Sequence, residues 1–462
     1  MNNRGVKIPL CPPLKKRGRL KCPGNVEKKD AYPMSENILE KMAFCLYDLA
    51  WKIAIPWLRK NQRLADGFGQ RTLRREVPGR ADLWIQAASA GESYLAQAFL
   101  RKLMRPARPI RVLMTTNTRQ GMDILKKTAT DIAANRDDLD IRTAYFPFDQ
   151  PSLMAKAVHR IRPRVMVFLE LEMWPGLLSA LRKYGSKVLV INGRITAKSL
   201  KGYLFWPSVW QSLAPDQILA ISPDDADRFA TLFGKHRVTV MRNIKFDRIS
   251  EGEADEKNPL SEMIPLDRPF LVLGSTRQEE EPAIENMILH ILQQQPGTLI
   301  GLFPRHMHRI AYWETALKRM ETPWMLRSEL RGSVRESFSN GGVLLWDTFG
   351  ELSLAYASAK AVFVGGSLAQ LGGQNFLEPL ICGVIPVIGP SWENFAWVGA
   401  DMVEQGLVRV ASDWKAAADI LAAHLKKPQP KQVVHEAALR YVRERQGGTE
   451  QACRVVADLF DA

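Results

Sequence analysis

Short apolar runs recur along the chain, separated by longer stretches in which apolar residues return every three or four positions. The runs are typical of strands buried on both faces, and the longer stretches are typical of helices with one apolar face. The predicted strands of the N-terminal half are residues 82–88, 111–116, 164–169, 187–191, 217–221 and 238–241. Those of the C-terminal half are residues 270–274, 298–303, 342–346, 361–364 and 385–388. This alternation predicts the α/β class, with two doubly wound, Rossmann-like domains that face each other across a cleft.

An acidic stretch with a proline, residues 249–263, interrupts the alternation and is predicted to be a linker. It separates a predicted N-terminal domain, residues 65–248, from a C-terminal domain, residues 264–462. The last helix is a candidate for packing back on the N-terminal domain. Residues 1–34 are rich in proline, lysine and arginine and are predicted to form a disordered basic tail.

Residues 35–64 have a different pattern. Lys41, Asp48, Lys52 and Arg59 fall on one helical stripe, and nearly all the other positions are apolar. The uncharged runs are shorter than the roughly 20 residues that span a bilayer. We therefore predict an amphipathic helix that lies in the membrane interface, with a buried helix of the N-terminal domain as the alternative.

The charge of the chain narrows the range of partners. Lys and Arg number 64 against 49 Asp and Glu, a formal charge of +15, which favours an acidic partner. Nucleic acid, an anionic membrane and a phosphorylated ligand each satisfy this condition, but the sequence shows no helix-turn-helix, RNA-binding or zinc-finger motif. The five cysteines are scattered without C-x-x-C pairs, which favours a reduced protein without structural disulfides.

Residues 361–390 form the most informative stretch, because two predicted strands flank a glycine-rich segment that includes Gly373. In such a βαβ unit, backbone N–H groups at the start of the helix attract a phosphate. Asn375 suits the N-cap position, and Glu378 suits the third position of the helix. The alternative is a capped helix without a ligand.

Candidate acid–base groups follow the predicted strands of the N-terminal half. Glu92 stands in a loop of small residues, where a carboxylate can take a proton from a substrate hydroxyl; the alternative is a carboxylate favoured by the first turn of a helix. Glu172, beside Glu170, can orient an acceptor or cap a helix, and Arg194 can meet a phosphate. Ser89 lacks the first glycine of a nucleophile elbow.

Residues compatible with an anion follow three predicted strands of the C-terminal half. Ser275 and Thr276 offer hydroxyls, Arg305 offers a planar cation, and Gly350-Glu351-Leu352 follows a third strand. Because the carboxyl ends of parallel strands meet at one edge of a sheet, these residues predict a nucleotide phosphate site.

In this order, the motifs resemble the 3-deoxy-D-manno-octulosonic acid (Kdo) transferase family of lipopolysaccharide and lipid A biosynthesis. The match runs from about Trp51 to the C-terminus. Its landmarks are Ala88-Ser89-Ala90-Gly91-Glu92, Phe146-Pro147-Phe148-Asp149, Glu170-Leu171-Glu172-Met173-Trp174-Pro175, Asn192-Gly193-Arg194, Gly274-Ser275-Thr276, Pro304-Arg305-His306, Gly350-Glu351-Leu352, and Gly372-Gly373-Gln374-Asn375 with Glu378-Pro379.

The resemblance implies a GT-B-type glycosyltransferase that moves Kdo from CMP-Kdo to a lipid A precursor of the lipid IVA type, with inversion at the anomeric carbon. The family's general base lies in its ASxGE motif, which carries over to Glu92. The acceptor is expected on the N-terminal domain, at Ser89, Gly91, Glu172 and Arg194. The donor is expected on the C-terminal domain, at Ser275, Thr276, Arg305, Gly350, Glu351, Leu352, Gly373, Asn375 and Glu378.

The implied partners are CMP-Kdo as co-substrate, the lipid A precursor and the anionic surface of the inner membrane, at its cytoplasmic face, with no nucleic acid. No cofactor and no metal are expected, because no Asp-x-Asp pair stands among the matched motifs. Two positions depart from the family pattern. Gln374 stands where many members have histidine, and it keeps a hydrogen-bonding side chain without a charge. Arg277 stands where histidine often follows Gly-Ser-Thr.

Three other interpretations stay open at the level of sequence. The first is another GT-B enzyme that uses a UDP-sugar, as a transferase or an epimerase. The second is a basic nucleic-acid-binding protein, whose binding would depend steeply on salt. The third is a membrane-associated scaffold without catalysis.

Overall fold

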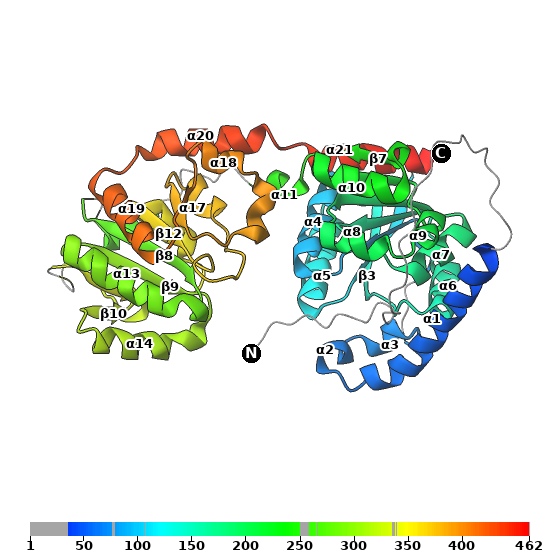
Figure 1. Cartoon of the computed structure of the whole chain (residues 1–462), viewed down its shortest axis with the longest axis horizontal. Helices are drawn as coiled ribbons and strands as arrows, with labels where there is room; N and C mark the ends of the chain where they lie inside the picture. Colours follow the sequence, from blue (N-terminus) through cyan, green and yellow to red (C-terminus); the bar gives the residue numbers. More distant parts are fainter. Residues whose placement is uncertain are drawn as a thin grey trace, which may run out of the picture.

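A computed structural model of the chain shows two lobes, the N-terminal lobe on the right of Figure 1 and the C-terminal lobe on the left. The structure describes residues 36–75, 79–106, 108–249, 258–265, 267–334, 338 and 340–461. The predicted basic tail, residues 1–34, lies outside the described residues, and so do residues 250–257 of the predicted linker.

The N-terminal lobe is built on one parallel sheet in the order β3-β2-β1-β4-β5-β6-β7. Its strands are β1 (Leu83–Gln86), β2 (Ile110–Thr116), β3 (Leu139–Tyr145), β4 (Val165–Leu169), β5 (Lys187–Gly193), β6 (Gln217–Ala220) and β7 (Val238–Val240). Its helices are α4 (Ala90–Lys102), α5 (Arg119–Ala133), α6 (Pro151–Ile161), α7 (Pro175–Tyr184), α8 (Ala197–Tyr203), α9 (Pro207–Ser212), α10 (Pro223–Phe233) and α11 (Ile244–Asp247). Because the strands are parallel, all of them end at one edge of the sheet.

The C-terminal lobe repeats this plan, with a parallel sheet in the order β10-β11-β9-β8-β12-β13-β14. Its strands are β8 (Phe270–Thr276), β9 (Leu299–Pro304), β10 (Trp324–Leu326), β11 (Gly342–Leu345), β12 (Ala361–Val364), β13 (Pro386–Ile388) and β14 (Arg409–Val410). Its helices are α12 (Leu260–Met263), α13 (Glu281–Gln294), α14 (Ile310–Arg319), α16 (Leu352–Ser358), α17 (Leu377–Ile381), α18 (Asp401–Glu404), α19 (Trp414–Lys426) and α20 (Lys431–Arg443). The expectation of two doubly wound α/β domains is confirmed.

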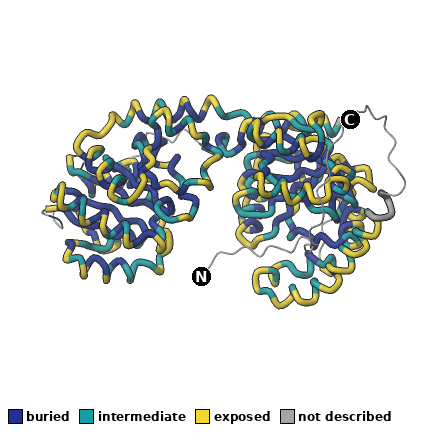
Figure 2. The backbone as a smooth tube through the Cα atoms, viewed as in Figure 1, coloured by how far each residue is buried: buried dark blue, intermediate teal, exposed yellow. Residues whose placement is uncertain are grey.

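Each sheet separates two apolar cores. In β1, Leu83 and Ile85 point into one core of the N-terminal lobe, while Trp84 points into the other. Successive residues of a strand face opposite sides, so a strand covered by helices on both sides must be apolar at every position. Figure 2 shows the result, with buried strands inside each lobe and exposed positions on the outer helix surfaces.

The last helix, α21 (Gly448–Asp461), packs on the N-terminal lobe (Figure 1). Its residues Ala452, Cys453 and Val456 are buried in the same core as Phe99 of α4. The chain therefore ends on the lobe in which it began, although most of its second half forms the other lobe.

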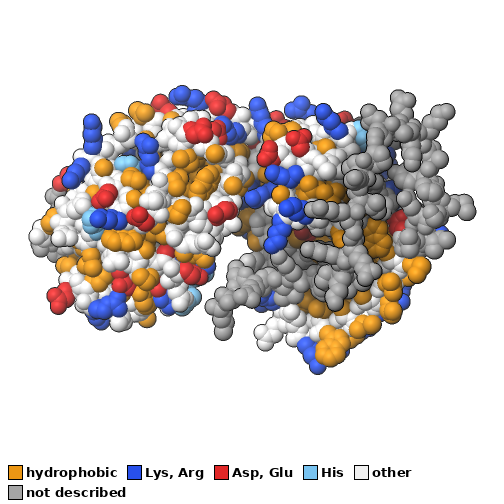
Figure 3. All heavy atoms as spheres, viewed as in Figure 1, with side chains coloured by type: hydrophobic (Ala, Val, Ile, Leu, Met, Phe, Trp, Pro, Cys, Tyr) orange, Lys and Arg blue, Asp and Glu red, His pale blue; other side chains and the backbone are white. Residues whose placement is uncertain are grey.

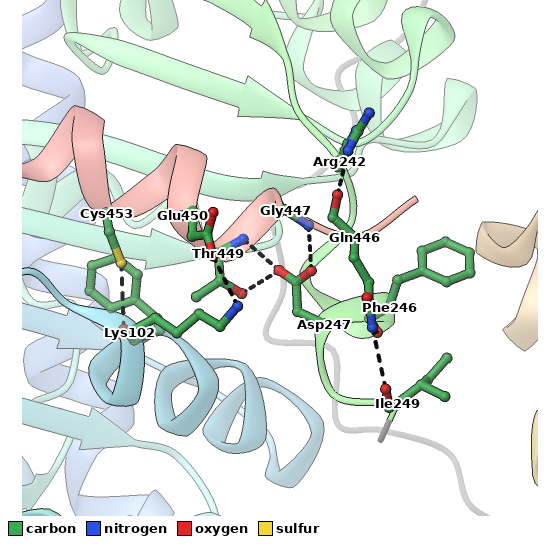
Figure 4. Close-up of polar contacts among 11 residues, drawn as sticks. Lys102, Arg242, Phe246, Asp247, Ile249, Gln446, Gly447, Thr449, Glu450 and Cys453 are labelled. Carbon is green, nitrogen blue, oxygen red and sulfur yellow. Dashed lines mark hydrogen bonds and ion pairs between the residues drawn. The ribbon is translucent and has the colours of Figure 1, made fainter. Parts of the chain in front are cut away.

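A carboxylate fixes the start of this helix. The side chain of Asp247, in α11, accepts hydrogen bonds from the backbone N–H groups of Gly447 and Thr449, both at 2.6 Å, and from the Thr449 hydroxyl (Figure 4). Gln446 donates its side-chain amide to the carbonyl of Phe246. These contacts join the two stretches of chain that pass between the lobes.

The inner face of α1 (Glu36–Leu58) packs on the N-terminal lobe. Trp51 is only 4% exposed, and the Tyr47 hydroxyl donates to the Asp149 carboxylate at 3.0 Å. Asp48 accepts the backbone N–H of Ser152, at the start of α6, at 2.8 Å. These contacts hold α1 against the lobe around residues 47–51.

The outer face of α1 carries an exposed apolar stripe of Met42, Leu46, Leu49, Ile53 and Trp57, each at least 52% exposed. Their spacing of three and four residues places them on one side of the helix. Figure 3 shows this apolar surface at the lower right, along the course of α1. Among the described residues, no helix is both long and apolar enough to cross a membrane.

The strands that the sequence pattern missed, β3, β10 and β14, all lie at sheet edges. An edge strand meets solvent along one side, so its sequence mixes polar and apolar residues, as in β3 with Asp140 and Arg142. β10 and β14 are also only three and two residues long. A second difference concerns α4, which begins at Ala90, so Glu92 lies in the first turn of a helix, as in the alternative interpretation, and not in a loop.

Candidate functional site

Glu92 lies in the first turn of α4, three residues after Ser89, which is the N-cap residue of this helix. The Ser89 hydroxyl accepts the backbone N–H of Glu92 at 3.3 Å and donates to the Glu92 carboxylate at 3.1 Å. The same carboxylate accepts the backbone N–H of Ala88 at 2.5 Å. The cap fixes the side chain without using all its lone pairs. Beside it, Gly91 is exposed, and a Cβ there would meet only the Ser89 hydroxyl at 3.7 Å, so the backbone is uncrowded next to Glu92.

Two further glutamates lie near Glu92, because β4 is the neighbour of β1 in the sheet. Burial, followed by the charge of Glu170, raises the pKa of Glu92 to about 7. Burial, followed by the charge of Glu92, raises the pKa of Glu172 to about 8, although Trp174 donates its indole N–H to Glu172 at 2.6 Å. The structure thus brings the predicted residues Glu92, Ser89, Gly91 and Glu172 together.

Lys245 of α11 completes this group. Its ammonium nitrogen is 2.8 Å from the Glu170 carboxylate and 5.7 Å from the ring centroid of Trp397, in the C-terminal lobe. Glu170 has a φ of +58°, in the left-handed region that disfavours side chains and that often marks functional positions. The three glutamates therefore lie beside the boundary between the lobes.

A cavity of about 640 Å³ opens between the lobes near this group. The loops after β5, β6 and β7 line it on one side, and residues around Trp397 and Gly399 line it on the other. Arg194 lies in its wall and forms no hydrogen bond or ion pair with the rest of the described chain. An anionic group entering the cavity would meet this guanidinium.

The predicted donor residues gather at the carboxyl edge of the second sheet. The strands β11, β9 and β12 lead into the loops that hold residues 350–352, Arg305 and residues 373–378, respectively, and Ser275 and Thr276 are the last two residues of β8, which lies between β9 and β12. Because these strands are parallel neighbours, their loops emerge side by side.

Within this group, Arg305 faces Glu378. Burial raises the pKa of the Glu378 carboxyl overall, while the Arg305 charge opposes that shift. Asn375 donates its side-chain amide to Glu378 at 2.8 Å, and its carbonyl oxygen accepts the backbone N–H of Leu377 at 3.2 Å. The helix α17 has five residues and begins at Leu377, and its N-cap residue is Phe376. Asn375 therefore lies one position before the predicted N-cap position.

The glycine turn after β12 is held by a buried carboxylate. The backbone N–H groups of Gly366, Ser367 and Leu368 donate to the carboxylate of Glu280. Glu280 also accepts the N–H of Arg277 at 2.9 Å, and it is only 2% exposed. These donors hold the loop together from within and are not available to a ligand.

The other donor candidates differ in how far their side chains are already used. Glu351 accepts hydrogen bonds from Arg327 at 2.9 Å, Trp346 at 2.7 Å and Thr348 at 2.9 Å, so its carboxylate holds its own loop. The buried Thr276 hydroxyl has no hydrogen-bond partner in the described part of the chain.

Backbone conformation marks the same loops. Ser275 has a φ of +56°, and Gly350 and Gly373 have φ of +87° and +78°. A Cβ on Gly350 would meet nothing within 4 Å, so the backbone there is open, and Leu352 is partly exposed at the start of α16.

Lys245, Glu280 and Asp247 were missed by sequence reasoning. Lys245 and Asp247 belong to a four-residue helix, too short for any periodicity to reveal which way its side chains point. Glu280 stands in a run of three acids, and only the folded chain shows that it reaches the turn after β12. Across the described ranges, no group of three or more His, Cys, Asp or Glu residues is arranged to hold a metal ion.

Comparison with known proteins identifies relatives in sequence and in fold. Residues 60–248 match the family model of 3-Deoxy-D-manno-octulosonic-acid transferase (kdotransferase). A 3-deoxy-D-manno-octulosonic acid transferase of Bordetella pertussis is 29% identical over 432 residues, which cover 89% of this chain and 98% of the relative. One of Haemophilus influenzae is 27% identical over 427 residues, which cover 90% and 94%.

Among solved structures, the UDP-GlcNAc 2-epimerase of Neisseria meningitidis bound to UDP-GlcNAc matches with a TM-score of 0.52 at 12% identity, covering 82% of this chain and 99% of that one. This likeness concerns the fold alone, a pair of facing Rossmann-like lobes of the GT-B type. The sequence relatives and the family model go further: residues 60–248 match the Kdo transferase family, most of the chain is similar to Kdo transferases, and the chain is a glycosyltransferase.

Proposed function

We propose that this chain transfers Kdo from CMP-Kdo to the sugar hydroxyl of a lipid A precursor of the lipid IVA type, with inversion, and that Glu92 is the general base. In an inverting transfer, one carboxylate takes the proton of the acceptor hydroxyl as that oxygen attacks the anomeric carbon, while the nucleotide phosphate leaves on the opposite side. Similarity to Kdo transferases supports both CMP-Kdo as the donor and glycosyl transfer as the reaction.

The observation that carries the proposal is the environment of Glu92. Its carboxyl group stands at the carboxyl edge of the sheet, held by the Ala88 N–H and the Ser89 hydroxyl, beside an exposed glycine and near the lobe boundary. A pKa of about 7 suits a base at neutral pH, because the ionised form is present and still binds a proton well. The group must be deprotonated to act, so the transfer rate is expected to fall as the pH drops below about 7.

The donor side is supported by Arg305, Asn375 and Glu378. The Arg305 cation suits the phosphate of a leaving CMP, because a preorganised positive charge stabilises the negative charge that develops there. The Glu378 carboxylate, steadied by Asn375, is placed to accept hydrogen bonds from ribose hydroxyls. The N–H group of Gly373 already donates to the Gly366 carbonyl at 2.8 Å and that of Gly366 to Glu280 at 2.6 Å, so neither is proposed for the phosphate.

The acceptor side is supported by the exposed apolar stripe of α1. An apolar helix face with cationic neighbours is suited to the interface of an anionic membrane. Lys60 lies 5.6 Å from the ring of Trp57, and Arg59 is also exposed. We propose that the stripe docks the enzyme on the inner membrane at its cytoplasmic face, where an acylated acceptor is embedded.

The test is incubation of the purified protein with tetraacylated lipid A precursor and CMP-Kdo formed in situ. The proposal expects product heavier than the acceptor by one or more Kdo residues, and it expects CMP, but not UDP, to raise the melting temperature. Stabilisation by UDP alone, without Kdo transfer, would instead support the enzyme that uses a UDP-sugar.

A further inference from the structure

Two arginines stand side by side at the edge of the C-terminal sheet. Thr276 of β8 and Pro304 of β9 are paired in register, and the backbone N–H of Arg305 donates to the carbonyl of Thr276 at 2.8 Å. The next residue on each strand is an arginine, Arg277 and Arg305. Like charges on neighbouring strands repel each other, so this arrangement is unfavourable until an anion lies between them.

The charge of Arg277 is poorly matched by the protein itself. Its side-chain Nε is buried and has no hydrogen-bond partner in the described part of the chain. The nearest carboxylate, on Glu279, is 3.9 Å away, which is longer than a hydrogen bond. Arg305 is exposed, and its side chain forms no hydrogen bond or ion pair among the described residues, although Glu378 lies close enough to be affected by its charge.

The turn after β12 holds Arg277 in place. A Cβ at Gly366 would lie 3.6 Å from Cγ of Arg277 and 3.1 Å from Cγ of Gln374, so both side chains pack against this glycine. Gly366 also has a φ of +69°. The glycine therefore lets the two side chains approach, and the amide of Gln374 lies beside the guanidinium stem as a further hydrogen-bonding group.

Other sources of positive charge at this edge are weak. Burial, followed by the charges of Arg277 and Arg305, lowers the pKa of His306, so its ring is neutral at pH 7. The N–H groups of residues 366–368 already bind Glu280. An anion arriving here would be held chiefly by the two guanidinium groups, whose planar forks suit an oxyanion.

We propose that Arg277 and Arg305 form a two-arginine clamp for an anionic group of the sugar donor. The clamp makes Arg277 a donor-binding residue, alongside the motif residues that the family resemblance points to. CMP-Kdo carries two oxyanions, the phosphate and the carboxylate of the sugar, and either suits the clamp. The inference rests on the proposed function, because it takes the donor to be a nucleotide-linked sugar acid.

The experiment compares the wild type with Arg277→Met and Arg277→Lys. The dissociation constants of CMP and of cytidine, which lacks the phosphate, are measured by calorimetry, and KM is measured for CMP-Kdo formed in situ. If the clamp holds the phosphate, Arg277→Met raises the dissociation constant of CMP by about 10- to 100-fold, because a charge-assisted hydrogen bond is lost, and leaves that of cytidine unchanged. If the clamp holds the sugar carboxylate, the dissociation constant of CMP is unchanged and KM for CMP-Kdo rises by a similar factor.

Arg277→Lys keeps the charge but not the planar fork, so its loss of donor affinity should be smaller than that of Arg277→Met. If Arg277→Met does not fold, Arg277→Lys takes its place in the test. The clamp is refuted if neither variant changes CMP binding or KM for CMP-Kdo. This failure can be told apart from failure of the proposed function. In the former, the wild type still binds CMP and transfers Kdo; in the latter, the wild type itself does neither.

Discussion

Glu280 offers a sharp test of how the donor side is held together. Its carboxylate accepts four backbone N–H groups, those of Gly366 at 2.6 Å, Arg277 at 2.9 Å, and Ser367 and Leu368 at 3.3 Å each. Replacing it by alanine leaves these donors without their acceptor in a site that is 2% exposed in the native protein. We therefore expect the turn after β12 to loosen.

The size of the effect follows from the bonds. A buried donor left without a partner costs about 1–3 kcal/mol, so the two short bonds account for about 3–4 kcal/mol and the two long ones for less. Water entering the vacated space and the relief of the buried charge reduce the total, and about 4 kcal/mol remains a reasonable expectation for Glu280→Ala. Glu280→Gln keeps one acceptor oxygen and should lose about half as much.

The assay is hydrogen exchange of the peptide that covers the turn, read by mass spectrometry. A loss of about 4 kcal/mol corresponds to faster exchange by roughly 1,000-fold at the amides of residues 366–368. Glu279→Gln is the matched control, because the Glu279 side chain is half exposed and its one ion pair among the described residues, with Arg277, is long at 3.9 Å. This variant should change the exchange rate by less than threefold, which corresponds to about 0.5 kcal/mol. The reasoning is refuted if Glu280→Ala exchanges as slowly as the control.

Three other predictions concern the membrane face, the junction of the lobes and the buried glutamates. Ile53→Glu, in the apolar stripe of α1, should lower binding to anionic vesicles by more than about 10-fold, whereas Val433→Glu, at an equally exposed position of the C-terminal lobe, should not; equal losses would contradict docking through α1. Asp247→Ala should destabilise α21 by about 2 kcal/mol in hydrogen exchange, with Asp247→Asn less affected because asparagine also caps helices; an unchanged exchange rate in residues 448–461 would contradict the cap. The pKa of Glu172 in the folded protein is raised to about 8, so ionisation of this carboxyl disfavours the folded state as the pH rises from about 5 to 8. In urea unfolding, the free energy of unfolding of Glu172→Gln should exceed that of the wild type by more than about 1 kcal/mol at pH 8 and by little at pH 5. A difference that does not depend on pH would contradict the raised pKa.

Much of the fold could be predicted because strands buried on both faces must be apolar at every position. β12 was located to the residue, and β4, β5 and β8 to within two residues at each end. The edge strand β3 escaped because half of its surface meets solvent and its sequence alternates with charges. A central strand buried on both faces is recognisable from its continuous apolar run, whereas a partly exposed edge strand such as β3 is not.

The candidate site was predictable where motifs end strands, and less so where side chains reach across the fold. Glu92 and Glu172 were predicted separately, and the sheet order brings them together. Lys245 and Glu280 leave no local signal, since their partners Glu170 and Gly366 are 75 and 86 residues away along the chain. The bonds of the N–H groups at Gly366 could not be predicted for the same reason, because their partner lies on another strand's loop.

The central claim is that Glu92 takes the proton of the acceptor. The most direct measurement is the single-turnover rate of Kdo transfer by Glu92→Gln, at saturating donor and acceptor, beside its melting temperature and its stabilisation by CMP. The account predicts a rate at least about 100-fold below the wild type, with folding and CMP binding preserved, because glutamine keeps the shape of the side chain but cannot accept the proton. A variant that transfers Kdo within about fivefold of the wild-type rate would contradict it, since loss of a general base costs far more.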